Sequence, residues 1–201
     1  MVQGPHFYVG LDLGQRADFS AFAAVEYRSG GLPHLLSPWT IPESLYELRN
    51  LQRVPLGSPY AKVVDALAAF MSVPELAGRS TLVVDATGLG TPVVEMIRDR
   101  NMDCTLIPVI ITGGEIGRVN GRFRTVPKRD LVSNLELMFD NGELRIAAKL
   151  PNRARLVAEL MNMKTRKSKD GTEAMGAEGK HHDDLVLAVA LAAWAARKRS
   201  M

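Results

Sequence analysis

The sequence predicts an α/β fold in which helices cover one mixed β-sheet. Three observations predict it. Three strand-like segments separated by turns open the chain, strand-like and helix-like segments then alternate, and two of the apolar strands end in an aspartate. Apolar residues make up 46% of the chain and charged residues 23%, which is typical of globular proteins that bury a full core.

The first three predicted strands are short runs bounded by turn residues. They are residues 7–13 (FYVGLDL), 21–27 (AFAAVEY) and 34–41 (HLLSPWTI). The polar residues 14–18 and the Gly30-Gly31 pair form the turns between them, which favours an antiparallel meander. Residues 43–59 contain several prolines, and we expect them to be irregular.

The second part of the chain alternates between the two periodicities. Predicted strands and helices are residues 60–71 (helix), 81–85 (strand), 91–98 (helix with Thr91 as N-cap), 104–111 (strand), 127–139 (helix), 143–147 (strand), 152–162 (helix) and 183–198 (amphipathic helix). Residues 112–125 read as a loop, and residues 164–180 as a polar hairpin or loop. This alternation favours parallel strands joined by helical crossovers.

Charge is unevenly distributed along the chain. Residues 1–114 hold 8 Lys/Arg against 11 Asp/Glu, whereas residues 115–170 hold 13 against 7. A basic segment of this kind can hold phosphates, although a solvated surface explains it equally well. The lone Cys104 excludes an intrachain disulfide, and no apolar run reaches the length of about 20 residues that crosses a bilayer. We expect a single domain over residues 1–201, without a signal peptide and located in the cytoplasm.

Four aspartates stand at positions where functional side chains collect. Asp12 and Asp85 end apolar strands, and Asp183 and Asp184 open the final helix. If the two strands are parallel neighbours, their acids emerge at one sheet edge, and the final helix can bring its own acids to them. Clustered carboxylates repel one another, and hard divalent cations such as Mg²⁺ or Mn²⁺ relieve this. Two such ions can activate a water and stabilise a leaving oxygen.

Each of these acids also has a structural interpretation. Asp183 or Asp184 can cap the final helix, and Asp85 can form a turn. Asp12 is harder to explain in this way, because a carboxylate inside an apolar strand is expensive to bury. The conjunction of all four therefore favours a metal site. His181 and His182 beside the acidic pair can position a water, but exposed loop histidines are the simpler interpretation.

Several segments together resemble the nuclease domain of the phage terminase large subunit. They are residues 10–14 (GLDLG), 83–90 (VVDATGLG), 127–131 (PKRDL), 142–146 (GELRI) and 182–188 (HDDLVLA). The resemblance spans nearly the whole chain, and the HDDLV motif on a helix is its most specific part. GLDLG and VVD are shared with many ribonuclease H-like enzymes.

The resemblance implies a ribonuclease H-like mixed sheet and metal-dependent endonucleolytic cleavage of concatemeric viral DNA during genome packaging. The family's metal ligands carry over to Asp12, Asp85 and Asp184, with Asp183 as a further ligand. Related enzymes often have glutamate at the second of these positions. The implied partners are double-stranded DNA, an ATPase motor domain, the small terminase subunit and the portal. This sequence contains no Walker A motif, so the resemblance assigns it no ATP-driven translocation.

Basic residues near the acids are the candidates for holding the DNA backbone. They are Arg118, Arg122, Arg124, Lys128 and Arg129, with Lys164, Arg166 and Lys167 flanking the groove. Contacts to phosphates read no sequence, so we expect weak sequence preference and strong salt dependence.

Three alternatives remain open from the sequence. A Holliday-junction resolvase of the same superfamily would prefer four-way junctions. A fragment of an actin-like ATPase or sugar kinase, suggested by Asp12-Leu13-Gly14, would bind nucleotide. A non-catalytic DNA-binding module would bind DNA without metal-dependent cleavage.

Overall fold

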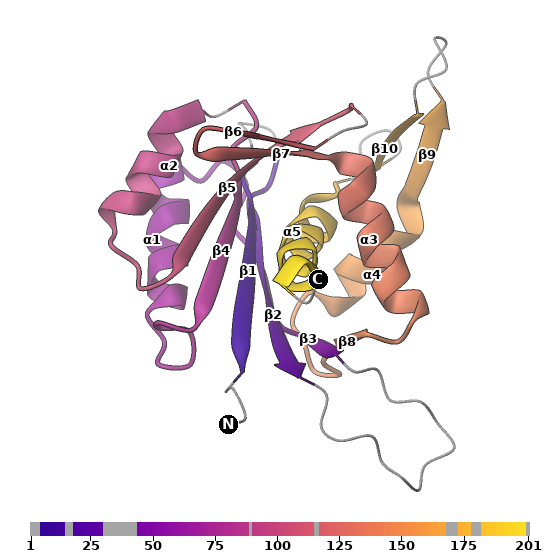
Figure 1. Cartoon of the computed structure of the whole chain (residues 1–201), viewed down its shortest axis with the longest axis horizontal. Helices are drawn as coiled ribbons and strands as arrows, with labels where there is room; N and C mark the ends of the chain where they lie inside the picture. The colour runs from indigo at the N-terminus through magenta and orange to yellow at the C-terminus, as the bar shows by residue number, and fades with distance from the viewer. Residues whose placement is uncertain are drawn as a thin grey trace, which may run out of the picture.

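A mixed sheet organises the molecule (Figure 1). The computed structural model describes residues 5–14, 18–29, 44–88, 90–114, 117–167, 173–177 and 182–199. In these residues the sheet has eight strands, in the order β6-β7-β5-β4-β1-β2-β3-β8. Their bounds are β1 (His6–Asp12), β2 (Ala21–Ser29), β3 (Ser44–Arg53), β4 (Ser80–Asp85), β5 (Thr105–Thr112), β6 (Arg118–Asn120), β7 (Phe123–Pro127) and β8 (Leu144–Ile146).

The sheet is mixed, as predicted, although its third strand is a different segment and the antiparallel pair β6–β7 was not predicted. Strands β1, β2 and β3 form an antiparallel meander. Strands β4, β5 and β7 extend the sheet in parallel from β1, and β8 pairs in parallel with β3 at the other side. A separate antiparallel hairpin consists of β9 (Met163–Lys167) and β10 (Glu173–Ala177), as the polar segment predicts.

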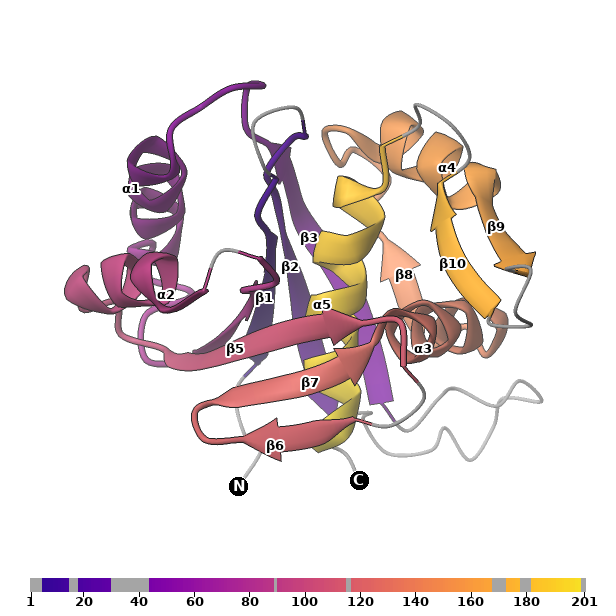
Figure 2. The same ribbon diagram turned by 90° about the horizontal axis from the view of Figure 1, so that it is seen from above.

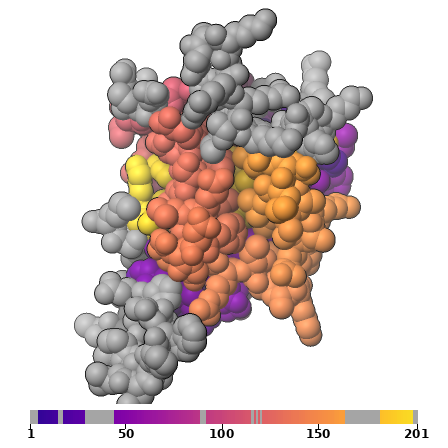
Figure 3. All heavy atoms as spheres, turned by 90° about the vertical axis from the view of Figure 1, so that its right-hand side faces the viewer, coloured from indigo at the N-terminus to yellow at the C-terminus, as the bar shows by residue number. Residues whose placement is uncertain are grey.

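Helices cover both faces of this sheet (Figure 2). On one face lie α1 (Tyr60–Met71) and α2 (Gly90–Asp99); on the other lie α3 (Lys128–Asp140), α4 (Arg153–Asn162) and α5 (Asp184–Arg199). Figure 3 shows α3 and α4 on the outside, with small patches of α5 visible beside them. The sheet separates two apolar clusters, because alternate residues of each strand point to opposite faces. None of the described helices combines the length and the hydropathy that a membrane span requires.

Helix α5 differs from its prediction as an amphipathic helix. Every residue from Asp184 to Ala196 is buried, because the sheet lies beneath the helix while α3 and α4 lie beside it. Its many alanines allow this close packing on several sides. A helix that is apolar all round is typical of a core rather than a surface element.

Other boundaries also differ from the predictions. Residues 43–59 were expected to be irregular, which is wrong for Ser44–Arg53, the long third strand. The expected strand at residues 34–41 lies outside the described residues. Residues 112–125 are not only a loop, since they include β6 and the start of β7. Helix α2 begins at Gly90, so Thr91 is not its N-cap.

Candidate active site

Asp12 and Asp85 lie side by side at one edge of the sheet. Strands β1 and β4 are parallel neighbours, with Leu11 opposite Val84, so the next residue of each strand is an aspartate. Both carboxyls point to the α5 face, because they share the strand alternation of residues on that face: Val83 lies two residues before Asp85, and Tyr8 lies four residues before Asp12. Asp12 is buried and Asp85 half-buried. The backbone N–H of Thr87 donates to Oδ1 of Asp85 at 2.8 Å.

A close contact between β1 and α5 brings the second acidic pair to the first. A Cβ on Gly10 would lie 2.0 Å from the carbonyl oxygen of Ala188 and 2.8 Å from the backbone nitrogen of Ala192. Only glycine therefore allows the helix to rest directly on the strand. Two residues further along β1, and about one helical turn back along α5, lie Asp12 and Asp184.

The electrostatics show how closely these carboxylates interact. Burial raises the pKa of the Asp12 carboxyl well above its usual range. The negative charges of Asp85, Asp183 and Asp184 raise that pKa further, and Lys128 opposes them only weakly. Burial also raises the pKa of Asp85, against several opposing effects that include a side-chain hydrogen bond with Asp12. The cluster therefore carries more negative charge than its surroundings compensate.

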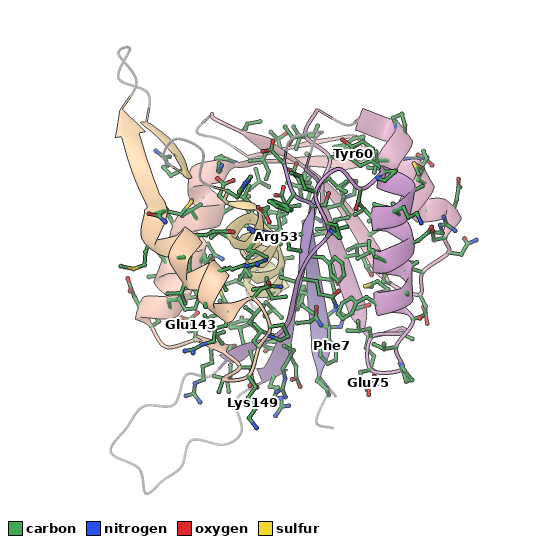
Figure 4. The ribbon with its side chains drawn as sticks, turned by 180° about the vertical axis from the view of Figure 1, so that it is seen from behind. Phe7, Arg53, Tyr60, Glu75, Glu143 and Lys149 are labelled. Atoms are coloured by element: carbon green, nitrogen blue, oxygen red, sulfur yellow. The ribbon has the colours of Figure 1, made fainter. Side chains whose placement is uncertain are left out.

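A β-bulge brings an arginine into this site. The register between β2 and β3 shifts after Ala24, which pairs with Asn50, while Val25 pairs with Leu48. Arg49 is the extra residue, so Leu48, Leu51 and then Arg53 all face α5. Figure 4 labels Arg53 beside this helix. Its Nε donates to Oδ2 of Asp184 at 2.7 Å, and its Nη2 donates to Oδ1 at 3.0 Å.

Glu159 of α4 shares this arginine. Nη2 of Arg53 also donates to Oε1 of Glu159, while Oε2 accepts hydrogen bonds from the backbone N–H groups of Leu185 at 3.1 Å and Val186 at 3.3 Å. Burial and then the charge of Asp184 raise the pKa of Glu159 to about 7, although Arg53 lowers it. Burial likewise raises the pKa of Asp184, again opposed by Arg53. Glu159 thus satisfies backbone donors at the start of α5.

Lys128 and an aromatic pair complete the surroundings. Lys128, the first residue of α3, donates from Nζ to Oδ2 of Asp183 at 2.6 Å. The guanidinium of Arg53 lies over the Phe19 ring, 4.7 Å from its centroid. The His182 ring meets the same Phe19 ring edge-on, with 4.9 Å between centroids. His182 is therefore half-buried in contact with the site rather than an exposed loop residue.

The oxygen ligands of these residues suit a hard divalent cation, but they do not form a complete coordination site in this structure. Among the described side chains, no three His, Cys, Asp or Glu groups are gathered as they stand into a set that could hold a metal ion. In the structure, Arg53 pairs with Asp184, and Lys128 pairs with Asp183. The oxygen-only donor set and the uncompensated charge at Asp12 nevertheless match what Mg²⁺ or Mn²⁺ requires. Release of these two cations would free the carboxylates.

The predicted DNA-binding residues fall into three groups. Arg122, Arg124 and Arg129 are exposed, although Arg122 lies 3.8 Å from Glu95 in a loose ion pair. Lys128 is occupied by Asp183. The side chains of the remaining candidates, Arg118, Lys164, Arg166 and Lys167, lie outside the described residues.

Arg124 has the most informative position of these. Asp85 pairs with Val109, and Val109 pairs with Arg124, so the arginine lies two strands from the aspartate in the same row of the sheet. It shares a face with Val126, which belongs to the core beneath α5. At the usual strand spacing, its Cα lies about 10 Å from that of Asp85.

Comparison with known proteins was made on sequence and on structure. No family model matches the chain. In sequence it is 26% identical over 188 residues to the terminase large subunit of Thermus phage G20c, and equally similar to that of Thermus virus P23-45. The match covers 93% of this chain but only 31% of the relatives, so the chain spans about a third of their length.

The solved structures with a similar fold are nuclease domains of large terminase subunits. The large terminase nuclease of phage G20c with bound magnesium has a TM-score of 0.66 and 24% identity, covering 94% of this chain and 81% of that one. The nuclease domain of the large terminase subunit of bacterial virus Sf6, with manganese, has a TM-score of 0.64 and 13% identity, covering 96% and 89%. The chain is similar in sequence to the phage terminase large subunit, and its fold is the ribonuclease H-like fold of large terminase nuclease domains.

Proposed function

We propose that this chain is a metal-dependent endonuclease that cleaves double-stranded viral DNA during genome packaging. The observation that carries the proposal is the convergence of four carboxylates at one sheet edge, where burial and mutual repulsion raise the pKa of Asp12. The names of the relatives and the metal ions in the titles of the similar structures support it.

In this proposal Asp12, Asp85 and Asp184 are metal ligands, with Asp183 as a further ligand. Two bound Mg²⁺ or Mn²⁺ ions would lower the pKa of an attacking water and balance the charge of the leaving oxygen. The protein contributes position: Asp12 is fixed by β1 and by the buried helix above it, and Asp85 is held by the Thr87 N–H. Rigid acids of this kind lose little freedom when a metal binds.

The DNA backbone would lie along the side of the sheet that carries Arg124. We assign Arg124 and the exposed Arg122 and Arg129 to contacts with phosphates, and we assign Arg118, Lys164, Arg166 and Lys167 to the same role by sequence alone. Contacts with phosphates alone predict cleavage with weak sequence preference.

Further partners are proposed only from the likeness to terminase large subunits. Because the chain spans about a third of their length, an ATPase motor domain, a small terminase subunit and a portal are proposed partners in the host cytoplasm.

The decisive experiment measures cleavage of linear duplex DNA with Mg²⁺, with Mn²⁺ and with EDTA. Asp12→Asn and Asp184→Asn should each reduce the rate by about 100-fold or more, because a charged group that acts on the reacting centre is lost. Asp140→Asn, which changes an exposed carboxylate at the far end of α3, is the matched control and should cleave normally. Substantial cleavage by both site variants, or cleavage that EDTA does not suppress, would refute the proposal. A four-way junction cut in preference to linear duplex would favour a resolvase.

A further inference from the structure

Arg53 occupies the carboxylate that the proposed function needs. Its Nε and Nη2 donate to the two different oxygens of Asp184, at 2.7 and 3.0 Å. The two side chains are only 11% and 5% exposed, so water screens the pair poorly. A divalent cation that binds an oxygen of Asp184 would compete with these donors for its negative charge and would be repelled by the guanidinium beside it.

Glu159 provides a second place for the same arginine. It accepts a hydrogen bond from Nη2 through Oε1, and it is anchored independently through Oε2 to the N–H groups of Leu185 and Val186. Glu159 therefore stays in place when the contact between Arg53 and Asp184 breaks. Phe19 supports the arginine from its flat side, since the guanidinium lies 4.7 Å from the ring centroid. The guanidinium of Arg53 thus lies between the carboxylates of Asp184 and Glu159, and only Asp184 is a proposed metal ligand.

We propose that Arg53 and Glu159 are positioning residues of the metal site: Arg53 is the counter-ion of Asp184 in the metal-free chain, and Glu159 retains Arg53 when a divalent cation takes Asp184. This inference rests on the proposed function, because it needs Asp184 to be a ligand. The guanidinium and the metal ion repel each other and compete for the same oxygens. Without Glu159, the displaced guanidinium would be left buried and unpaired, which is a costly state.

The two residues should therefore affect metal affinity in opposite directions. Loss of Arg53 removes a competitor and a repelling charge. Loss of Glu159 leaves Asp184 as the remaining carboxylate partner of Arg53 in this network, so the arginine is harder to displace. A purely structural ion pair between β3, α4 and α5 makes a different prediction, since loss of either residue would then loosen the site and weaken metal binding.

The test measures binding of Mn²⁺ alone, without DNA, to the full chain by titration calorimetry at constant pH. Arg53→Gln should lower the Kd for Mn²⁺ about tenfold, and Glu159→Gln should raise it about tenfold, as expected for a nearby charge in a poorly screened site. In the double variant the Glu159→Gln effect should disappear, because it acts through Arg53. Arg145→Gln, an exposed arginine on β8, is the control and should bind as the wild type does.

Each outcome separates the two proposals. If the wild type binds no Mn²⁺, or if Asp12→Asn leaves its Mn²⁺ binding unchanged, the proposed function fails. If the wild type binds Mn²⁺ but Arg53→Gln weakens binding or leaves it unchanged, only the role of Arg53 and Glu159 is overturned. Should Arg53→Gln fail to fold, Glu159→Gln decides: it retains an oxygen for the Leu185 and Val186 N–H groups, and unchanged or tighter Mn²⁺ binding by this variant overturns the inference.

Discussion

The two halves of the acidic cluster are held in opposite ways. Asp12 and Asp85 are fixed by neighbouring strands, and among the described residues neither forms an ion pair. Asp183 and Asp184 begin a helix, and each is held by a cation from another element, Lys128 or Arg53. The strand pair thus has no ion-pair partner among the described residues, whereas each acid of the helix pair has one and, in the proposed function, would exchange it for a metal ion.

In the proposed function, this difference would let one site be stable without metal and still bind it. Four uncompensated carboxylates at one sheet edge would repel one another strongly. Neutralising two of them leaves a cluster that the fold tolerates. An incoming divalent cation would first meet Asp12 and Asp85, and would then compete for the helix pair.

The largest expected effect follows from separating the two halves. Gly10→Ala places a Cβ against backbone atoms of Ala188 and Ala192, which cannot rotate away. We expect a loss of about 3 kcal/mol in the free energy of unfolding, the upper end of overpacking costs, measured by urea denaturation. Gly113→Ala, whose Cβ would meet nothing within 4 Å, is the control and should change stability little. Wild-type stability of Gly10→Ala would show that α5 does not rest on β1.

The comparison also predicts stability changes of opposite sign. Asp184→Asn weakens a buried ion pair and should destabilise the metal-free chain by about 2 kcal/mol. Asp12→Asn removes a buried carboxylate that its neighbours repel and should stabilise the chain. Urea unfolding in EDTA measures both. If both variants lose similar stability, the two halves do not differ in charge compensation.

A smaller effect concerns pH. The pKa of Glu159 is raised to about 7 in the folded chain, above its unfolded value of about 4.3, so the folded state binds the proton more tightly. The free energy of unfolding of the metal-free chain should therefore increase as the pH is lowered from 8 through 7 towards 5.5. The raised pKa values of Asp12, Asp85 and Asp184 contribute in the same direction, so Glu159→Gln should reduce this slope without abolishing it. Burial raises the pKa of Glu26, but Arg28 and Arg49 lower it by more. The stability that Glu26 contributes is therefore lost only at lower pH, outside the range from 8 to 5.5. A slope unchanged in Glu159→Gln would contradict the assignment.

The smallest effect distinguishes a free cation from an occupied one. Arg124→Gln should lower the slope of log affinity for duplex DNA against log salt by about 1, as expected for one lost phosphate contact. Lys128→Gln should change that slope less, because Lys128 is paired with Asp183. Binding measured in EDTA at several salt concentrations gives both slopes. Equal changes would mean that DNA takes Lys128 from Asp183.

The strand and helix patterns were sufficient to predict the acidic positions. Asp12 and Asp85 each end an apolar run that reads as a buried strand, and Asp183-Asp184 stand at the start of a long apolar helix. The alternation of helices and strands favoured parallel pairing, but that β1 and β4 are neighbours was only assumed, and the structure shows it. The contact of Gly10 with α5 was not predicted, because it depends on the position of a helix from the other end of the chain.

Arg53 and Glu159 were missed for a physical reason. The side chains of β3 alternate up to Leu48, but the bulge at Arg49 shifts the alternation, so a regular strand pattern would assign Arg53 to the wrong face. Prolines on either side also made this segment look irregular. Glu159 lies within a predicted helix among other charged residues, and nothing in the sequence marks it as buried. The signal that was available is the alternation of Tyr46 and Leu48, which indicates a strand.

The burial of α5 has a consequence for how the chain folds. β1 and α5 meet although they come from opposite ends of the sequence, and contacts between such distant segments close slowly. Until the helix docks, the apolar surface of β1 and β2 stays uncovered and prone to aggregate. We therefore expect metal affinity to appear only in the last folding step, so that a nascent chain acquires this property after its whole sheet has assembled.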